Sequence, residues 1–265
     1  MLKKLTRLPK RTRDDIYIIS LLKNWMEVLS SKLKGRDFAI LRFRNGLVIE
    51  SPPEIRLEML FHEVWVEEMY SPANYKILPN DTVLDIGANI GVFSIFAATV
   101  ADNVRVLSFE PFPSNANWLE KNVMANGLPN VKVFRKAVSG EGGNKTLYIS
   151  DAWVGHSLNI DHDHDHVDEV DIECVTLDEV LSKISICNLL KIDCEGSEYD
   201  VFYPASDNSL KKIEKIVGEF HEIDTEKKNG KALCSFLMEN GFEITHFEDF
   251  GNGTGSFCAR RSNKE

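Results

Sequence analysis

The stretch VLDIGANIGVFSIFAATVADNVRVLSFE (83–110) decides the fold that we expect for this 265-residue chain. Its apolar run VLDIG (83–87) leads into a glycine-rich turn and then into an apolar helix over about 91–100. A second apolar run, VRVLSFE (104–110), follows the helix. Two continuous apolar strands joined by a helix are typical of a parallel sheet that is buried on both faces.

The alternation of strands and helices continues toward the end of the chain. We expect core strands at 131–139, 189–193 and 215–221, added strands at 146–150 and 170–177, helices near 114–126, 178–184, 208–213 and 227–240, and a closing antiparallel pair at 242–249 and 254–260. The predicted fold class is therefore α/β, a doubly wound Rossmann-like sheet that is mostly parallel with an antiparallel last strand.

We expect an N-terminal extension over residues 1–75 and the main domain over 76–265. The extension combines a basic tail (1–13), an amphipathic helix (15–34), a hairpin that turns at Asn45-Gly46, and a helix over 54–70. Two interpretations of the basic helix stay open: it packs on the main domain, or it makes a peripheral contact with anionic lipid.

Composition excludes several classes of protein. A formal charge of −10 argues against nucleic acid as the main partner, because phosphate binding needs a basic face. The five cysteines are scattered and form no CxxC pair, which indicates reduced thiols and a cytoplasmic protein. Since no apolar stretch of about 18 residues occurs, we expect no transmembrane helix and at most an association with the cytoplasmic face of a membrane.

The turn DIGANIG (85–91) is a candidate cofactor loop. Gly87 and Gly91 allow a sharp bend and a close approach of a ligand to the backbone. The spacing is GxNxG and not the GxGxxG of pyrophosphate-binding loops, and Glu110 closes the second strand, where a carboxylate accepts hydrogen bonds from ribose hydroxyls. The combination predicts an adenosine without phosphates, hence S-adenosylmethionine. Asp85 would either accept from the cofactor's ammonium group or fix the loop.

These residues, together with later ones, resemble the FkbM family of methyltransferases. The matching stretches are VLDIGANIGVFSIFAA (83–98), SFEPFPSNANWLEKNVMANGL (108–128), KAVS (136–139), VTLDEVL (175–181), LLKIDCEGSEYDVF (189–202) and EFHE (219–222). The resemblance implies O-methylation of a hydroxyl on a sugar, a glycan or another small metabolite. It also implies that Asp85, Gly87, Asn89, Gly91 and Glu110 hold the cofactor, and that Ala137 and Val138 lie against the adenine.

The candidate catalytic residues lie at the ends of the fourth and fifth core strands: Asp193 and Glu195 at or just past the fourth, and Glu219 and His221 on or just past the fifth. Glu219 and His221 should share one face of their strand. Either His221 or Asp193 takes the proton of the acceptor hydroxyl directly, or Asp193, Glu219 and His221 bind a divalent cation such as Mg²⁺ that acidifies it. The latter would be similar to catechol O-methyltransferase. The third interpretation is that the carboxylates are structural, and Glu198 fits that class best.

The segment DHDHDHVDEVD (161–171) is rich in histidine. Three interpretations of it stay open: a solvated loop, a zinc or nickel site, and a lid over the substrate. Trp153, His156 and Ser157 are candidate pocket residues beside it. Two rival functions also stay open: N-methylation of a small molecule, and a scaffold that binds the cofactor without catalysis.

Overall fold

The computed structural model describes residues 9–150 and 166–262. Its helices are α2 (Lys10–Leu21), α3 (Trp25–Leu33), α4 (Leu57–Phe61), the π-helical turn η1 (His62–Val66), the 3₁₀ turn η2 (Ala73–Tyr75), α5 (Val92–Thr99), α6 (Pro113–Ala125), α7 (Leu177–Ser182), α8 (Glu198–Phe202), α9 (Asp207–Leu210) and α10 (Gly230–Glu239). Its strands are β1 (Ile40–Arg42), β2 (Val48–Glu50), β3 (Thr82–Ile86), β4 (Arg105–Phe109), β5 (Val131–Phe134), β6 (Lys136–Ser139), β7 (Gly143–Ser150), β8 (His166–Thr176), β9 (Leu189–Ile192), β10 (Lys215–His221), β11 (Phe242–Asp249) and β12 (Thr254–Arg261).

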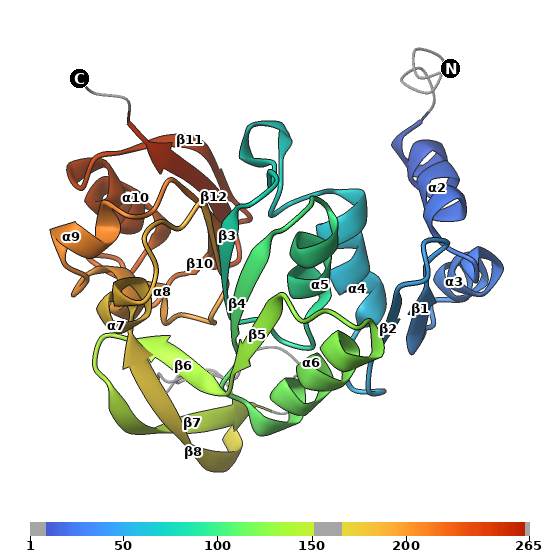
Figure 1. Ribbon diagram of the computed structural model, residues 1–265, viewed down its shortest axis with the longest axis horizontal. Helices are drawn as coiled ribbons and strands as arrows, with labels where there is room; N and C mark the ends of the chain where they lie inside the picture. Colours follow the sequence, from blue (N-terminus) through green and yellow to red (C-terminus); the bar gives the residue numbers. More distant parts are fainter. Residues whose placement is uncertain (1–8, 151–165, 263–265) are drawn as a thin grey trace.

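Seven strands form the main sheet in the order β11-β12-β10-β9-β3-β4-β5. The pairs from β10 to β5 are parallel, and β12 is antiparallel to both β10 and β11. The strand order reverses beside β3. From β3 the chain first adds β4 and β5 on one side of the sheet, and it then returns to add β9 and β10 on the other side. Helices lie on both sides of this sheet (Figure 1). The α/β doubly wound, Rossmann-like fold with an antiparallel last strand is therefore confirmed.

Alternation along the central strands builds two cores, one on each face of the sheet. Val83 and Val106 pack in the cluster that contains α5, and Leu84 and Leu107 pack in the cluster that contains α7 to α10. All four side chains are buried. Both faces of the strands are covered, which explains why their sequences are continuous apolar runs rather than alternating ones.

The expected third strand over 131–139 is wrong as a single element. Residues 131–134 pair with β4, whereas residues 136–139 pair with β8 in a separate three-stranded sheet, β6-β8-β7. Arg135 lies between the two pieces, and its guanidinium donates to Glu120 and Asn117 of α6. This anchor marks the point at which the chain leaves the main sheet.

The expected helix over 15–34 is also wrong as a continuous element. It is divided into α2 and α3 because Leu22 is extended and forms a bridge with Phe43. Asn24 then donates from its amide to the carbonyl of Ile40 and accepts from the backbone of Arg42. The predicted hairpin therefore forms, and its contacts with Leu22 and Asn24 interrupt the expected helix.

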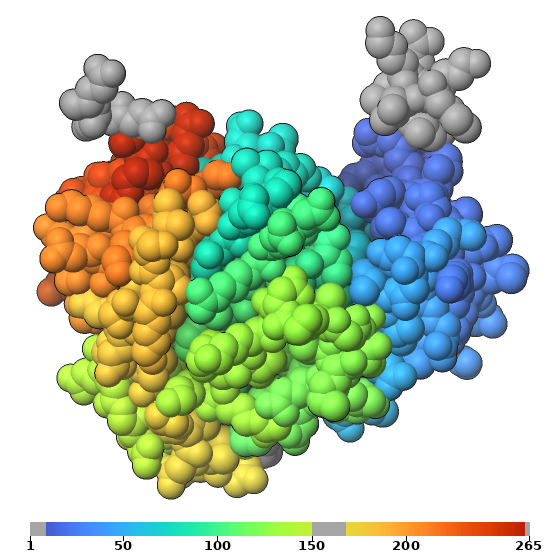
Figure 2. Space-filling view, viewed as in Figure 1, coloured from blue at the N-terminus to red at the C-terminus, as the bar shows by residue number. Residues whose placement is uncertain are grey.

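The N-terminal elements pack against the body of the molecule (Figures 1 and 2). One hydrophobic cluster includes Ile18, Phe43 and Trp65 together with Val83 and Phe96. The cluster thus crosses the expected boundary between residues 75 and 76, and the two-domain division stays a prediction. Within the described part of the chain, no helix combines the length and the apolar character needed to span a bilayer. Membrane contact through the basic helix likewise stays a prediction.

Candidate functional site

The loop after β3 is held against its neighbours by its own backbone. The amides of Gly87 and Ala88 both donate to the carbonyl of Phe109, at the end of β4. Gly87 has φ +76°, and a Cβ placed on it would lie 1.7 Å from the carbonyl oxygen of Asp193. The bend therefore needs glycine because the loop after β9 passes directly over it. At Gly91 an added Cβ would meet only the end of the Leu119 side chain, which can move, so it is the left-handed backbone, with φ +89°, that favours glycine there.

Glu110 lies at the carboxyl end of β4 and is buried. One carboxylate oxygen accepts from the amide of Asn89 at 2.8 Å, and the other accepts from the amide of Phe112 at 2.9 Å. Burial raises the pKa of Glu110 to about 7, and the two amides oppose that shift. Each oxygen keeps a further lone pair, so the carboxylate can still accept from the hydroxyls of a ribose.

Asp85 belongs to a buried polar network and is fully inaccessible. Its Oδ2 accepts from Ser94 Oγ at 2.5 Å, and Ser94 also bonds Ser108 at 2.8 Å. Lys191 Nζ lies 3.4 Å from Asp85 Oδ1 and donates to the carbonyl of Gly87 at 2.7 Å. Of the two roles expected for Asp85, the contacts favour fixing the loop.

Three predicted residues converge at the carboxyl ends of β9 and β10: Asp193 directly follows β9, and Glu219 and His221 are among the last three residues of β10. Asp193, Glu219 and His221 each offer one ligand atom, and these atoms lie within 4.8 Å of one another. Glu219 and His221 share a face of β10, as expected from their spacing. Burial, followed by the charge of Asp193, raises the pKa of Glu219 to about 8. The cluster therefore places two carboxyl groups and one imidazole side by side, near the point where the strand order reverses.

His221 is surrounded by carboxylates. Its Nδ1 lies 3.0 Å from the fully buried Glu198, and its Nε2 lies 3.3 Å from Glu195. Burial alone would lower the pKa of His221, but the hydrogen bond to Glu198 and the surrounding negative charges raise it to about 10. The imidazole consequently carries a proton at neutral pH. Glu195 adopts φ +53°, so a strained residue joins the cluster.

Sequence reasoning missed two further residues of this cluster. The hydroxyl of Tyr70 donates to Glu219 at 2.7 Å and lies 3.2 Å from Asp193. Lys191, in the middle of β9, lies 3.8 Å from Asp193 and 5.3 Å from the centre of the Tyr70 ring. The charges of Asp85 and Asp193 raise the pKa of Lys191 against the effect of its burial. A lysine within the apolar run LLKI was the available signal for a buried ion pair.

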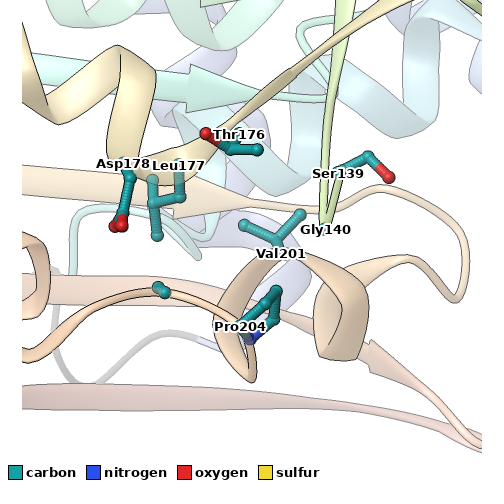
Figure 3. A pocket seen from close by; sticks show the side chains of 8 residues that line it. Ser139, Gly140, Thr176, Leu177, Asp178, Val201 and Pro204 are labelled. Carbon is teal, nitrogen blue, oxygen red and sulfur yellow. The ribbon is translucent and has the colours of Figure 1, made fainter. Parts of the chain in front are cut away.

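The remaining predicted residues lie apart from the cluster or outside the part of the chain that the structure describes. Ala137 and Val138, on β6, are buried among protein side chains, and their contact with adenine stays a prediction. A cavity of about 80 Å³ beside β6 is lined by Ser139, Thr176 and Val201, among others (Figure 3). It is too small for an adenosine and contains none of the predicted site residues. Trp153, His156, Ser157, His162 and His164 lie outside the described residues.

The chemistry of these groups fits both expected ligands. Glu110 offers buried acceptor positions for ribose hydroxyls, beside a loop whose backbone is fixed. The cluster of two carboxylates and one imidazole is a donor set for a divalent cation. The carboxylate of Glu198 on Nδ1 would orient His221, as carboxylates do for metal-binding histidines.

The chain was compared with known proteins. The family model described as "Methyltransferase FkbM domain" matches residues 85–244. The 31-O-demethyl-FK506 methyltransferase FkbM of Streptomyces tacrolimicus is 27% identical over 239 residues, which cover 79% of this chain and 90% of that protein. The AMB antimetabolite synthetase AmbE of Pseudomonas aeruginosa is 28% identical over 233 residues, which cover 72% of this chain but only 11% of that longer protein. Among solved structures, Trm5b from Pyrococcus abyssi is 12% identical with a TM-score of 0.48, covering 86% of this chain and 57% of that one.

Proposed function

This chain belongs to the FkbM methyltransferase family and is an S-adenosylmethionine-dependent methyltransferase; from that premise we propose that it methylates a hydroxyl oxygen of a sugar or another small acceptor. The observation that carries the proposal is the convergence of Asp193, Glu219 and His221 where the sheet order reverses. An oxygen nucleophile must lose a proton, and this cluster is built to receive or stabilise one. The name of one relative also describes a substrate that lacks an O-methyl group.

S-adenosylmethionine supplies an electrophilic methyl carbon, so the protein's main task is to align the acceptor and remove its proton. In our proposal Glu110 accepts from the ribose hydroxyls, and the loop from Gly87 to Gly91 sets the position of the cofactor. Asp193 receives the proton of the acceptor hydroxyl. His221 is a poor base in this arrangement because the carboxylates around it keep it protonated. We assign it a charge-stabilising role unless a cation replaces its proton.

We propose as the competing mechanism that Asp193, Glu219 and a deprotonated His221 hold a divalent cation, Mg²⁺ or Mn²⁺, which would make the acceptor hydroxyl acidic enough to lose its proton to solvent. Treatment with a chelator is then expected to abolish methyl transfer, and added Mg²⁺ or Mn²⁺ is expected to restore it. The measurement is the initial rate of product formation with and without the metal. A rate that is unaffected by thorough chelation would remove the cation and leave Asp193 as the direct base.

Glu110→Ala is expected to weaken the binding of S-adenosylmethionine by about 1–3 kcal/mol, because it removes the acceptor of the ribose hydroxyls. Isothermal titration calorimetry measures the change. Glu120→Ala, which alters an exposed carboxylate paired with Arg135, is the matched control and should bind normally. Thermal unfolding of both variants separates loss of the cofactor from loss of the loop contacts to Asn89 and Phe112. Unchanged affinity in a folded Glu110→Ala protein would contradict the ribose role.

The proposed reaction is tested by incubating the protein with methyl-deuterated S-adenosylmethionine and a panel of sugars and lipid-linked glycans. Mass spectrometry should find the label on an acceptor, and fragmentation should place it on oxygen. A product labelled on nitrogen would support the N-methyltransferase alternative instead. Cofactor binding without any labelled product, across hydroxyl and amine acceptors alike, would favour the scaffold.

A further inference from the structure

Tyr70 brings a buried hydroxyl to the catalytic cluster from a part of the chain that precedes the family match. That match begins at residue 85, and Tyr70 lies in the turn that follows η1. Its hydroxyl lies 2.7 Å from Glu219 Oε1 and 3.2 Å from Asp193 Oδ2, and the residue is only 4% exposed. A side chain from the N-terminal segment therefore bridges two carboxyl groups that lie at the ends of different core strands.

The ring of Tyr70 is fixed by two side chains. It packs edge-on against Phe93 of α5, with the ring centres 5.6 Å apart and the planes at 71°. The ammonium group of Lys191 lies 5.3 Å from the centre of the Tyr70 ring. The turn that carries the ring is closed by its own backbone, since the amide of Ser71 donates to the carbonyl of Glu68 at 2.9 Å. These contacts set the position of the hydroxyl.

The hydroxyl of Tyr70 acts as a donor in this cluster. A phenol keeps its proton at neutral pH, and a carboxyl group, ionised or protonated, keeps an oxygen that can accept. Glu219 is the nearer acceptor of the single proton, and Asp193 shares it over the longer distance. The ammonium group of Lys191 lies 3.8 Å from the same oxygen of Asp193. Two donors therefore hold one oxygen of Asp193, and one of these donors also holds Glu219.

The other oxygen of each carboxyl group stays available. Within residues 9–150 and 166–262, neither Asp193 Oδ1 nor Glu219 Oε2 accepts a hydrogen bond or pairs with a charged side chain. Both mechanisms proposed for the reaction need such an oxygen, either to take the proton of the acceptor hydroxyl or to bind a cation. Tyr70 thus holds one oxygen of each group and leaves the other oxygen for the chemistry.

We propose that Tyr70 is a positioning residue for methyl transfer: its hydroxyl donates to Glu219 and Asp193 and holds their carboxyl groups in the orientation that the reaction needs. Tyr70 keeps its own proton throughout, because it acts through the two carboxyl groups and not as a base. The proposal rests on the proposed function, since it assigns a role in that reaction. The N-terminal segment then takes part in catalysis, because it supplies the donor that the two carboxyl groups share.

Tyr70→Phe removes the hydroxyl and keeps the ring. We expect a kcat that is about 10- to 100-fold lower, with the KM for S-adenosylmethionine unchanged, because the hydrogen bonding to two carboxyl groups is lost while Glu110 is untouched. Steady-state rates with the acceptor found in the labelling panel measure both constants. Tyr75→Phe is the matched control, since Tyr75 is also buried, at 2% exposed, and its hydroxyl bonds Thr245 Oγ1 at 2.6 Å, outside the cluster. It should keep the normal kcat.

A structural role and a positioning role give different results. Urea unfolding should find Tyr70→Phe folded, with a loss of stability comparable to that of Tyr75→Phe, since each variant loses the hydrogen bonding of one buried hydroxyl. 4-Aminophenylalanine at position 70 puts an amine, which also donates hydrogen bonds, in place of the hydroxyl, and it should restore kcat to within about fivefold of the wild type. Failure of Tyr70→Phe to fold, normal kcat in a folded Tyr70→Phe protein, or no rescue by the amine would each overturn the proposal.

Crystal structures of the wild-type protein and of Tyr70→Phe supply a readout that needs no turnover. The carboxyl groups of Asp193 and Glu219 should change orientation in the variant, because they lose the donor that they share, and carboxyl groups that stay in place would overturn the proposal. If they move but the wild-type protein methylates no oxygen, the proposed function fails while the positioning contact stands. If an oxygen is methylated and Tyr70→Phe is as fast as the wild type, the proposed function stands and the role of Tyr70 fails.

Discussion

Asp193→Asn is expected to lower the turnover of methyl transfer by about 100- to 10,000-fold, the usual range for losing a positioned proton acceptor. The amide cannot accept the proton of the acceptor hydroxyl, and it is a weaker ligand for a divalent cation. The affinity for S-adenosylmethionine should stay nearly unchanged, because Glu110 and the loop after β3 are untouched. The backbone amide of Asp193, which donates to Ile86 at 3.1 Å, is also retained.

Steady-state rates with the acceptor found in the labelling panel, together with calorimetry for the cofactor, measure the two effects separately. Asp200→Asn is the matched control, since Asp200 lies on α8, pairs with Lys228 and is outside the cluster. It should retain normal turnover. Normal turnover in Asp193→Asn would remove this carboxylate from the chemistry, whereas a parallel loss of cofactor affinity would assign it to binding.

Gly87→Ala is expected to destabilise the folded protein by at least about 3 kcal/mol. Two costs add at this position. The left-handed conformation costs an alanine about 1–2 kcal/mol, and the new Cβ would lie 1.7 Å from the carbonyl of Asp193. A backbone oxygen cannot move aside as a flexible side chain can. Relief of the clash would require β3 and β9 to separate at the point where the cofactor loop begins.

Gly127→Ala separates these two costs. Gly127 has φ +59°, and a Cβ there meets nothing within 4 Å, so this variant should lose only the conformational term of about 1–2 kcal/mol. Urea unfolding of both variants gives the difference. Equal destabilisation of the two proteins would show that the contact between the loop and Asp193 does not constrain the site.

The order of strands and helices was predictable because the central strands are buried on both faces and therefore read as uninterrupted apolar runs. The errors occur where tertiary contacts override local pattern. Arg135 gives no sign in the sequence that the chain leaves the main sheet there, because its partners Glu120 and Asn117 are on another element. The break at Leu22 depends on pairing with Phe43, which periodicity along one helix cannot reveal.

The candidate site could be predicted where its residues lie at the carboxyl ends of strands. Asp193, Glu219 and His221 were found because the carboxyl ends of parallel strands meet at one edge. Tyr70 was missed because it belongs to a segment expected to be an ordinary helix, more than a hundred residues before Asp193 in the chain. Only the folded arrangement brings the hydroxyl of Tyr70 between two carboxylates.

A crystal structure of the protein with S-adenosylmethionine tests most directly whether one crevice holds both the cofactor and the chemistry. We predict that the ribose hydroxyls lie on Glu110 and that the methyl group faces Asp193, Glu219 and His221. A structure in which the cofactor lies away from Glu110, or in which its methyl group points away from those three side chains, would contradict the proposed site.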